Sequence, residues 1–198
     1  MRLVLASASP RRRQLLETLS LDFDVVPAGV DETRFQGEPP TAYVERIAES
    51  KARAVLEPGR VVIGCDTTVV HEGKVLGKPS HPEEARSMLR RLEGDVHEVF
   101  TGIAVGGFED DRAVLHSVVD VAEVEFLPLT DGEIRDYVAT GEPMDKAGSY
   151  ALQGLGGVFI KRIKGSPFTV IGMPIHLLPR LISAVGADMT FFRVPTDG

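Results

Sequence analysis

Charged side chains that could act on a phosphate ester are scattered along this 198-residue sequence. The stretch "LASASPRRRQLL" places Ser7 and Ser9 directly before three arginines, Arg11, Arg12 and Arg13. Hydroxyls, the free N–H groups of a helix start and guanidinium forks together favour a phosphate group. Successive helical residues lie about 100° apart, so the three cannot all face one ligand. We expect one or two of them to bind a ligand and the third to be solvated, the alternative being an ordinary charged surface.

Lys51 lies on the apolar stripe of a helix that we expect over residues 40–56. The other members of the stripe recur at helical spacing: Val44, Ile47, Ala48 and Val55. Lys51 could snorkel from the edge of a packed face, with its ammonium in water. It could equally aim the ammonium into a cleft between helix and sheet. Position alone leaves both interpretations open.

Asp66 follows the apolar run "VVIGC", so we expect its carboxylate to emerge where a buried strand ends at a crevice. Open α/β sheets bind ligands at such strand ends. Thr67 and Thr68 add hydroxyls directly after it, although a capping or turn aspartate would look the same. Glu32, in "VDET", is a further acidic candidate, and nothing local distinguishes it from a surface glutamate.

Two later segments add basic and polar groups. Lys78 lies in "GKP", and Lys146 and Gln153 lie in "DKAGSYALQG". The small residues of the second segment permit close approach of the backbone to a ligand. Gln153 carries both a donor and an acceptor, which suits recognition of a base edge. The alternative is a glycine-rich connection with ordinary polar side chains.

Composition and missing motifs narrow the function classes. The net charge of −7 argues against binding to nucleic acid polymers or membrane surfaces by charge, but it leaves room for a local anion pocket. The single cysteine excludes an internal disulfide, and no run of about 18 apolar residues predicts a membrane span. The sequence contains no P-loop, zincin or serine-hydrolase elbow motif. We expect a cytoplasmic protein.

Strand-like and helix-like segments alternate along the chain, which predicts a mixed α/β sheet. Antiparallel pairing is expected where the turn "GGFEDD" joins two long strands, and a T-x-x-E capping box starts a helix at Thr130. We expect one domain over 1–198, with a loose tail at 189–198. The expected strands lie at 3–5, 61–70, 96–105 and 113–126, and the expected helices at 10–19, 40–56, 82–92, 131–140 and 174–185.

These segments, in this order, resemble the Maf family, also called septum-formation-inhibitor proteins. The matching stretches cover nearly the whole chain: "LASASPRRRQLL", "VDE", "AESKA", "VIGCDTTVV", "GKP", "HEVFTG", "DKAGSYALQG" and "IGMP". The resemblance implies a fold similar to inosine triphosphate pyrophosphatases, an elongated mixed sheet with two α/β lobes flanking a cleft. It implies hydrolysis of nucleoside triphosphates to the monophosphate and pyrophosphate with a divalent cation, Mg²⁺ or Mn²⁺.

The resemblance also implies roles for individual residues. It places the proton acceptor at Asp66 and substrate selection at Arg11, Thr67 and Gln153, a set similar to the dTTP/UTP pyrophosphatase branch. The 7-methyl-GTP branch differs at Arg11 and Gln153, while Thr68 stands here where an aliphatic residue is common. The phosphate chain would be held by Ser7, Ser9, Arg12, Lys51, Lys78 and Lys146, and the cation by Glu32 and Asp66.

The expected partner is therefore a nucleoside triphosphate, canonical or with a modified pyrimidine base, in nucleotide-pool sanitation. The resemblance allows a homodimer, although the sequence shows no heptad and no long apolar stripe. Two alternatives remain at this point. One is a nucleotide-binding regulator of septum formation without turnover. The other is a phosphoesterase that releases single phosphate.

Overall fold

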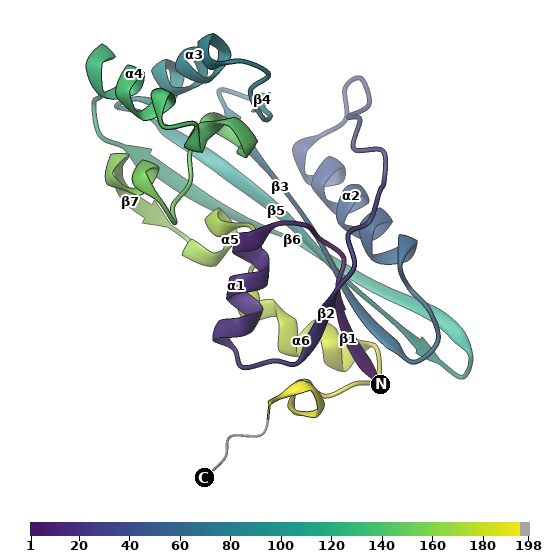
Figure 1. Cartoon of the computed structure of the whole chain (residues 1–198). Coiled ribbons are helices and arrows are strands. Elements are labelled where there is room, and N and C mark those ends of the chain that lie inside the picture. Colours follow the sequence, from purple (N-terminus) through teal and green to yellow (C-terminus); the bar gives the residue numbers. More distant parts are fainter. Residues whose placement is uncertain (195–198) are drawn as a thin grey trace. The chain divides into compact units, whose positions relative to one another are not determined.

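The computed structural model describes residues 1–194 (Figure 1), which form two compact units. Among the described residues, the first unit consists of Met1–Asp66, Thr101–Asp120 and residues 172–194. The second unit consists of Thr67–Phe100 and Val121–Ile171. Within residues 1–194, no helix is long and apolar enough to cross a membrane. The expected single domain over 1–198 stays a prediction.

Helices and strands alternate as expected, and the mixed α/β class is confirmed. The strands are β1 (Arg2–Leu5), β2 (Phe23–Val25), β3 (Arg60–His71), β4 (Lys74–Leu76), β5 (Val96–Glu109), β6 (Arg112–Phe126) and β7 (Ile160–Lys164). The α-helices are α1 (Pro10–Thr18), α2 (Pro40–Ala54), α3 (Pro82–Leu92), α4 (Asp131–Ala139), α5 (Pro167–Ile171) and α6 (Leu178–Ala184). Short 3₁₀ helices are η1 (Glu142–Asp145), η2 (Ala147–Ser149), η3 (Leu155–Phe159), η4 (Ile175–Leu177) and η5 (Met189–Phe192).

One seven-stranded sheet has the order β2-β1-β3-β5-β6-β7, and β4 pairs with β3 off this path. Strand β1 is parallel to both β2 and β3, whereas β4 is antiparallel to β3 and β7 to β6. Strands β5 and β6 are joined by Asp110 and Asp111 alone, with φ angles of 46° and 61°. Two successive positive φ values are typical of a type I′ hairpin turn, so these strands are antiparallel neighbours.

The first unit places α2 directly against the backbone of the sheet. A Cβ atom added to Gly64 of β3 would lie 2.2 Å from the carbonyl oxygen of Ala48, and one added to Gly102 of β5 would lie 2.3 Å from that of Val44. Only glycine allows so close an approach. The facing residues of α2 and the sheet form a small-residue core: Val4, Ala6, Ala48, Ala52, Val62 and Ala104.

The second unit has a core in which aromatic rings gather. His97, Phe126 and Tyr150 meet edge to face with ring centroids 4.8–5.3 Å apart, and His97 Nε2 lies 2.8 Å from the Tyr150 hydroxyl. Helices α3 and α4 pack on this core. The expected capping box is confirmed, because the Thr130 hydroxyl accepts the Glu133 N–H while the Glu133 carboxylate accepts the Thr130 N–H.

Several boundaries differ from the sequence expectation. Strand β5 runs to Glu109 because the turn needs only two residues, and Gly107 instead lies against Val185. The expected helix over 174–185 is divided into η4 and α6, because Pro179 lacks an N–H and can only occupy a first turn. Of the expected loose tail, residues 189–194 form η5 and a bridge from Arg193 to Leu21, while 195–198 lie outside the described residues.

Candidate functional site

A buried lysine joins two carboxylates in the first unit. The Nζ atom of Lys51 on α2 lies 2.8 Å from Oδ1 of Asp66 and 2.8 Å from Oε1 of Glu32. Lys51 and Asp66 are each 7% exposed, whereas Glu32 is exposed. A charge this buried is stable only when it is paired, because it has lost most of its hydration. Lys51 therefore does not snorkel to water but holds two acidic groups together.

The position of Asp66 differs from the sequence expectation. The strand expected at 61–70 is confirmed as β3, which continues to His71, so Asp66 lies in its middle and not at the strand end where its carboxylate was expected. The residues that follow it are mostly β-branched, and such side chains favour a pleated strand. The carboxylate is therefore held by the middle of a regular strand rather than by a loop.

The pairing of Lys51 with Asp66 follows from the packing of α2 on β3. Side chains two apart on a strand share a face, so Asp66 shares the face of Gly64. Residues three apart on a helix are neighbours, so Lys51 lies next to Ala48. Because Ala48 rests on Gly64, the next pair along both elements is Lys51 with Asp66. Two local periodicities thus bring together residues that are 15 apart in the sequence.

Two residues of α2 that the sequence analysis did not single out hold the segment that carries Glu32. The Tyr43 hydroxyl donates to the Glu32 carbonyl oxygen at 3.0 Å, and Arg46 donates to the Thr33 carbonyl oxygen at 3.0 Å. Arg46 also forms an ion pair with Glu38 at 2.7 Å. Tyr43 lies eight residues before Lys51, on the same helical stripe. The helical spacing that indicated Lys51 could therefore have indicated Tyr43 as well.

Tyr43 is a neutral hydroxyl beside the two carboxylates. Burial raises its pKa to about 12, and the negative charges of Asp66 and Glu32 act in the same direction. Cys65 is fully buried, and this burial raises its pKa to about 11 although Arg12 and Lys51 oppose the shift. At neutral pH the thiol therefore stays protonated, which makes Cys65 unsuitable as a nucleophile.

The three arginines at the start of α1 differ in burial. Arg12 is buried, Arg11 is half-buried and Arg13 is exposed. Arg13 forms an ion pair at 2.8 Å with Glu17, one turn along the helix. Arg13 is thus the solvated member of the three, and Arg11 and Arg12 remain the candidates for a ligand.

Arg12 is anchored within the first unit by two hydrogen bonds. Its Nε donates to the Gly172 carbonyl oxygen at 2.8 Å, and its Nη1 donates to the Ser7 hydroxyl at 3.1 Å. Ser7 also accepts the backbone N–H of Ser9 at 3.2 Å. Both acceptor sites of the Ser7 hydroxyl are therefore used, and its remaining capacity is that of a donor, which suits an anion. Ser9 is the N-cap of α1 as expected, but its side chain makes no capping hydrogen bond.

The second unit holds Lys146 and Lys78 on two segments that are bonded to each other. The backbone N–H of Gly148 donates to the Gly77 carbonyl oxygen at 3.1 Å. Lys146 donates to the Glu142 carbonyl oxygen at 2.6 Å and keeps little exposure, while Lys78 is exposed. One hydrogen bond therefore ties together the two lysine-bearing segments that the sequence separates by about 70 residues.

Gln153 and Thr67 are the remaining candidates in the second unit. Gln153 is exposed and directly precedes Gly154, whose backbone approaches the Glu142 carboxylate closely. Thr67 is half-buried and follows Asp66 on β3. Of the predicted site residues, Lys51 directly contacts Glu32 and Asp66, and Arg12 contacts Ser7. The roles of all of them stay predictions.

Glu32 and Asp66 are the acidic pair that could hold a cation. Residues 1–194 contain no cluster of three or more histidine, cysteine, aspartate or glutamate side chains that could hold a metal ion. Mg²⁺, however, is commonly bound by only one or two carboxylates together with substrate phosphates. Glu32 and Asp66 supply two such hard oxygen groups around one nitrogen. They therefore fit a cation that arrives with phosphate ligands.

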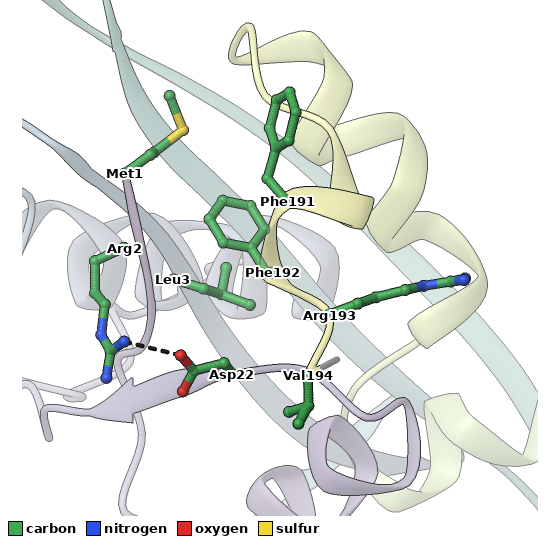
Figure 2. Close-up of a pocket in the computed structure, with 8 residues that line it drawn as sticks. All are labelled: Met1, Arg2, Leu3, Asp22, Phe191, Phe192, Arg193 and Val194. Atoms are coloured by element: carbon green, nitrogen blue, oxygen red, sulfur yellow. Dashed lines mark hydrogen bonds and ion pairs between the residues drawn. The ribbon is translucent and has the colours of Figure 1, made fainter. Parts of the chain in front are cut away.

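A hollow of about 230 Å³ in the first unit contains none of the predicted site residues (Figure 2). Phe191 and Phe192 line it on one side, and Arg2 and Asp22 form an ion pair at 2.9 Å on its wall. Asp22 also donates its N–H to the Phe192 carbonyl oxygen. The hollow therefore marks where the segment around η5 packs beside β1 and the entry to β2.

A family model and several curated relatives each match most of the chain. Residues 2–185 match the family model described as Maf-like protein. A dTTP/UTP pyrophosphatase from Anaeromyxobacter dehalogenans (strain 2CP-C) is 51% identical over 93% of this chain and 94% of its own. A dTTP/UTP pyrophosphatase from Anaeromyxobacter sp. (strain Fw109-5) is 49% identical over 93% of this chain and 90% of its own. A solved HAM1 protein from Coxiella burnetii is 16% identical with a TM-score of 0.37, over 64% of this chain and 73% of that chain.

Proposed function

This chain belongs to the family of Maf-like proteins, and from this premise we propose that it hydrolyses dTTP and UTP to the monophosphate and pyrophosphate. The observation that carries the proposal is the buried ammonium of Lys51, 2.8 Å from each of two carboxylates. A reaction on a triphosphate needs fixed cations to bind the chain and a carboxylate to act on water. The first unit holds both kinds of group in contact.

The triphosphate would be bound by cationic and hydroxyl groups, of which Arg12, Lys51 and Lys146 are already held by hydrogen bonds or ion pairs. In the first unit these are the Arg12 guanidinium, the donor capacity of Ser7 and Ser9, and Lys51. In the second unit they are Lys78 and Lys146. Prepositioned donors stabilise charge that develops on phosphate oxygens without reorganising during the reaction, and this term dominates phosphoryl transfer.

Asp66 would accept the proton of the attacking water. The water oxygen attacks the α-phosphorus, and the bond from this phosphorus to the oxygen that bridges to the β-phosphorus breaks. Pyrophosphate then leaves and the nucleoside monophosphate remains. General-base assistance of this kind contributes roughly 10²–10⁴-fold to the rate. Lys51 would keep the Asp66 carboxylate oriented in the step.

Glu32 and Asp66 would hold a divalent cation, Mg²⁺ or Mn²⁺. When bound, such a cation neutralises charge on the triphosphate. The backbone of Glu32 is held by Tyr43, which keeps the exposed carboxylate near Lys51. Removal of divalent ions with EDTA should abolish turnover, and addition of Mg²⁺ or Mn²⁺ should restore it.

The base of the nucleotide would be selected by Arg11, Thr67 and Gln153. The Gln153 amide can donate and accept at once, as recognition of a uracil or thymine edge requires. We place the enzyme in the cytoplasm, where it would remove unwanted pyrimidine nucleotides from the triphosphate pool. A homodimer is compatible with this function and would be tested by sedimentation.

The proposal is tested by product analysis with a nucleotide panel. The purified chain is incubated with Mg²⁺ and dTTP, UTP, CTP or GTP, and pyrophosphate and single phosphate are measured separately. We expect pyrophosphate, formed fastest from dTTP and UTP. Release of single phosphate would indicate a different phosphoesterase, and binding without product would indicate a nucleotide-binding regulator. Either result would overturn the proposal.

A further inference from the structure

The segment that carries Gln153 is fixed on both sides by two residues to which the proposed function gives no role. The Glu142 carboxylate accepts the backbone N–H groups of Leu155 at 3.0 Å and Gly156 at 3.1 Å. The Tyr137 hydroxyl donates to Glu142 at 2.9 Å and is hydrogen-bonded by the backbone of Ala151. The bonded backbone groups at 151, 155 and 156 flank Gln153 from two residues before to three residues after.

Two glycines make this contact possible. A Cβ atom on Gly154 would lie 2.6 Å from Oε1 of Glu142, and one on Gly156 would lie 2.5 Å from the Tyr137 hydroxyl. Contacts this short are essentially never seen for real Cβ atoms. The backbone beside Gln153 therefore rests directly on the two side chains. We call Tyr137 and Glu142 the loop clamp.

The loop clamp contains one charge at neutral pH. Partial burial acts to raise the pKa of Glu142, but the hydrogen bonds from Gly156, Leu155 and Tyr137 outweigh it and lower the pKa. An ionised carboxylate can accept all three hydrogen bonds at once, whereas an amide in its place would turn its NH₂ towards one of the donors. The clamp therefore depends on the charge of Glu142 and not only on its shape.

We propose that Glu142 and Tyr137 are positioning residues that set base discrimination by holding Gln153 in one orientation. This inference rests on the proposed function, since it concerns the base-recognition residue of the same site. A hydrogen-bonding side chain rejects a mismatched ligand strongly only if the side chain cannot turn or shift to accommodate it. Flexibility at 151–156 would allow Gln153 to adapt to other bases, so discrimination would fall more than turnover.

The test compares Glu142→Gln with wild type by kcat/KM for dTTP and for CTP. We expect the dTTP/CTP ratio to fall at least about tenfold while kcat for dTTP changes less. Tyr137→Phe should shift the ratio in the same direction by a smaller factor, because it keeps the carboxylate. Glu133→Gln is the matched control, since it removes a carboxylate that is hydrogen-bonded to Thr130 at the start of α4, where glutamine can also close the capping box. The ratio of kcat/KM for dTTP over CTP should be unchanged in Glu133→Gln.

A double variant separates positioning of Gln153 from a general loss of structure. In a Gln153→Ala background, Glu142→Gln should not lower the ratio further, because the residue through which it acts is gone. Hydrogen exchange at the Leu155 and Gly156 amides should become faster in Glu142→Gln, and this measurement requires no activity. An unchanged ratio in an active Glu142→Gln enzyme, or an additive loss in the double variant, would overturn the inference. Absence of pyrophosphate release by wild type would instead reject the proposed function.

Discussion

The acidic pair of the first unit and Gln153 of the second unit are held by different means. In the first unit full charges meet, since the Lys51 ammonium lies between Glu32 and Asp66. In the second unit a glycine-rich segment is held mainly through its backbone, with the Glu142 carboxylate accepting two N–H groups beside Gln153. Ion pairs of this kind suit the handling of phosphate and a proton, whereas a fixed backbone suits recognition of a base.

This difference makes separate predictions for rate and for selectivity. Changes to the charged cluster of the first unit should lower turnover of every nucleotide by a similar factor. Changes around the loop clamp should alter which nucleotide is preferred. The distinction between the two units would be refuted by either of two results. One is a variant of Lys51, Glu32 or Asp66 that changes only which nucleotide is preferred. The other is a variant of the loop clamp that lowers the turnover of all nucleotides equally.

The largest effect is expected for Asp66→Asn. The amide keeps the shape and can still accept a hydrogen bond from Lys51, whose ammonium keeps its ion pair with Glu32, so the protein should stay folded, with a melting temperature lowered by the loss of one buried charge pair. Loss of the proton acceptor should lower turnover of all nucleotides by roughly 10²–10⁴-fold. Pyrophosphate release and thermal melting are measured together. Asp24→Asn, an exposed carboxylate on β2, is the control, and near wild-type turnover in Asp66→Asn would remove this residue from the mechanism.

Gly64→Ala should be the next most damaging change. Its Cβ atom would lie 2.2 Å from the Ala48 carbonyl oxygen, so α2 must move away from β3 and carry Lys51 with it. We expect the free energy of unfolding to fall by about 1–3 kcal/mol and turnover to fall about 100-fold. Chemical denaturation and the pyrophosphate assay measure the two effects. Gly29→Ala, where a Cβ atom would meet open space, should change neither.

Arg11→Ala tests the limit of the distinction, because Arg11 belongs to the first unit but is proposed to select the base. We expect the ratio of kcat/KM for dTTP over CTP to fall several-fold, with little change in the melting temperature. Arg13→Ala, which removes an exposed arginine from the same helix start, should change the free energy of unfolding by less than about 0.5 kcal/mol. An unchanged nucleotide profile in Arg11→Ala would refute its assignment.

A smaller effect is expected when the pH is lowered. Burial lowers the pKa of His97 from 6.5 to about 3, so below pH 6.5 the unfolded chain binds a proton that the native chain does not. Stability from this residue is complete above pH 6.5 and decreases as the pH falls towards 3. Between pH 7 and 5 wild type should lose about 2 kcal/mol more than His97→Gln. Equal losses in chemical denaturation would show that His97 is not the cause.

Local patterns in the sequence predicted much of the fold. The ends of α3 and the Thr130 capping box were predicted correctly, because Pro82, Gly94 and the T-x-x-E spacing are local signals. The predicted boundaries were wrong where packing between distant segments overrides a local pattern. Gly107 looked like part of a turn, but it lies in β5 because the turn needs only Asp110 and Asp111, and a glycine is required there because Val185 leaves no room for a side chain.

The sequence indicated most residues of the candidate site, but it did not indicate which of them contact one another. Helical spacing placed Lys51 on the stripe that faces the sheet, yet nothing local indicated that Glu32 lies 2.8 Å from it. Tyr43 shares this stripe and was passed over, because an aromatic residue there looks like core. Glu142 was also missed, since its partners at 155 and 156 are brought to it by the glycines of a later segment.

The docking of α2 on Gly64 and Gly102 has a consequence for how the protein tolerates sequence change. At these two points the main chain of α2 rests on the main chain of the sheet, so the spacing between α2 and the sheet there does not depend on the size of a side chain between them. Substitutions that change side-chain volume elsewhere in the interior should therefore lower the melting temperature before they lower turnover. Substitutions at Gly64 or Gly102 should instead impair both properties together.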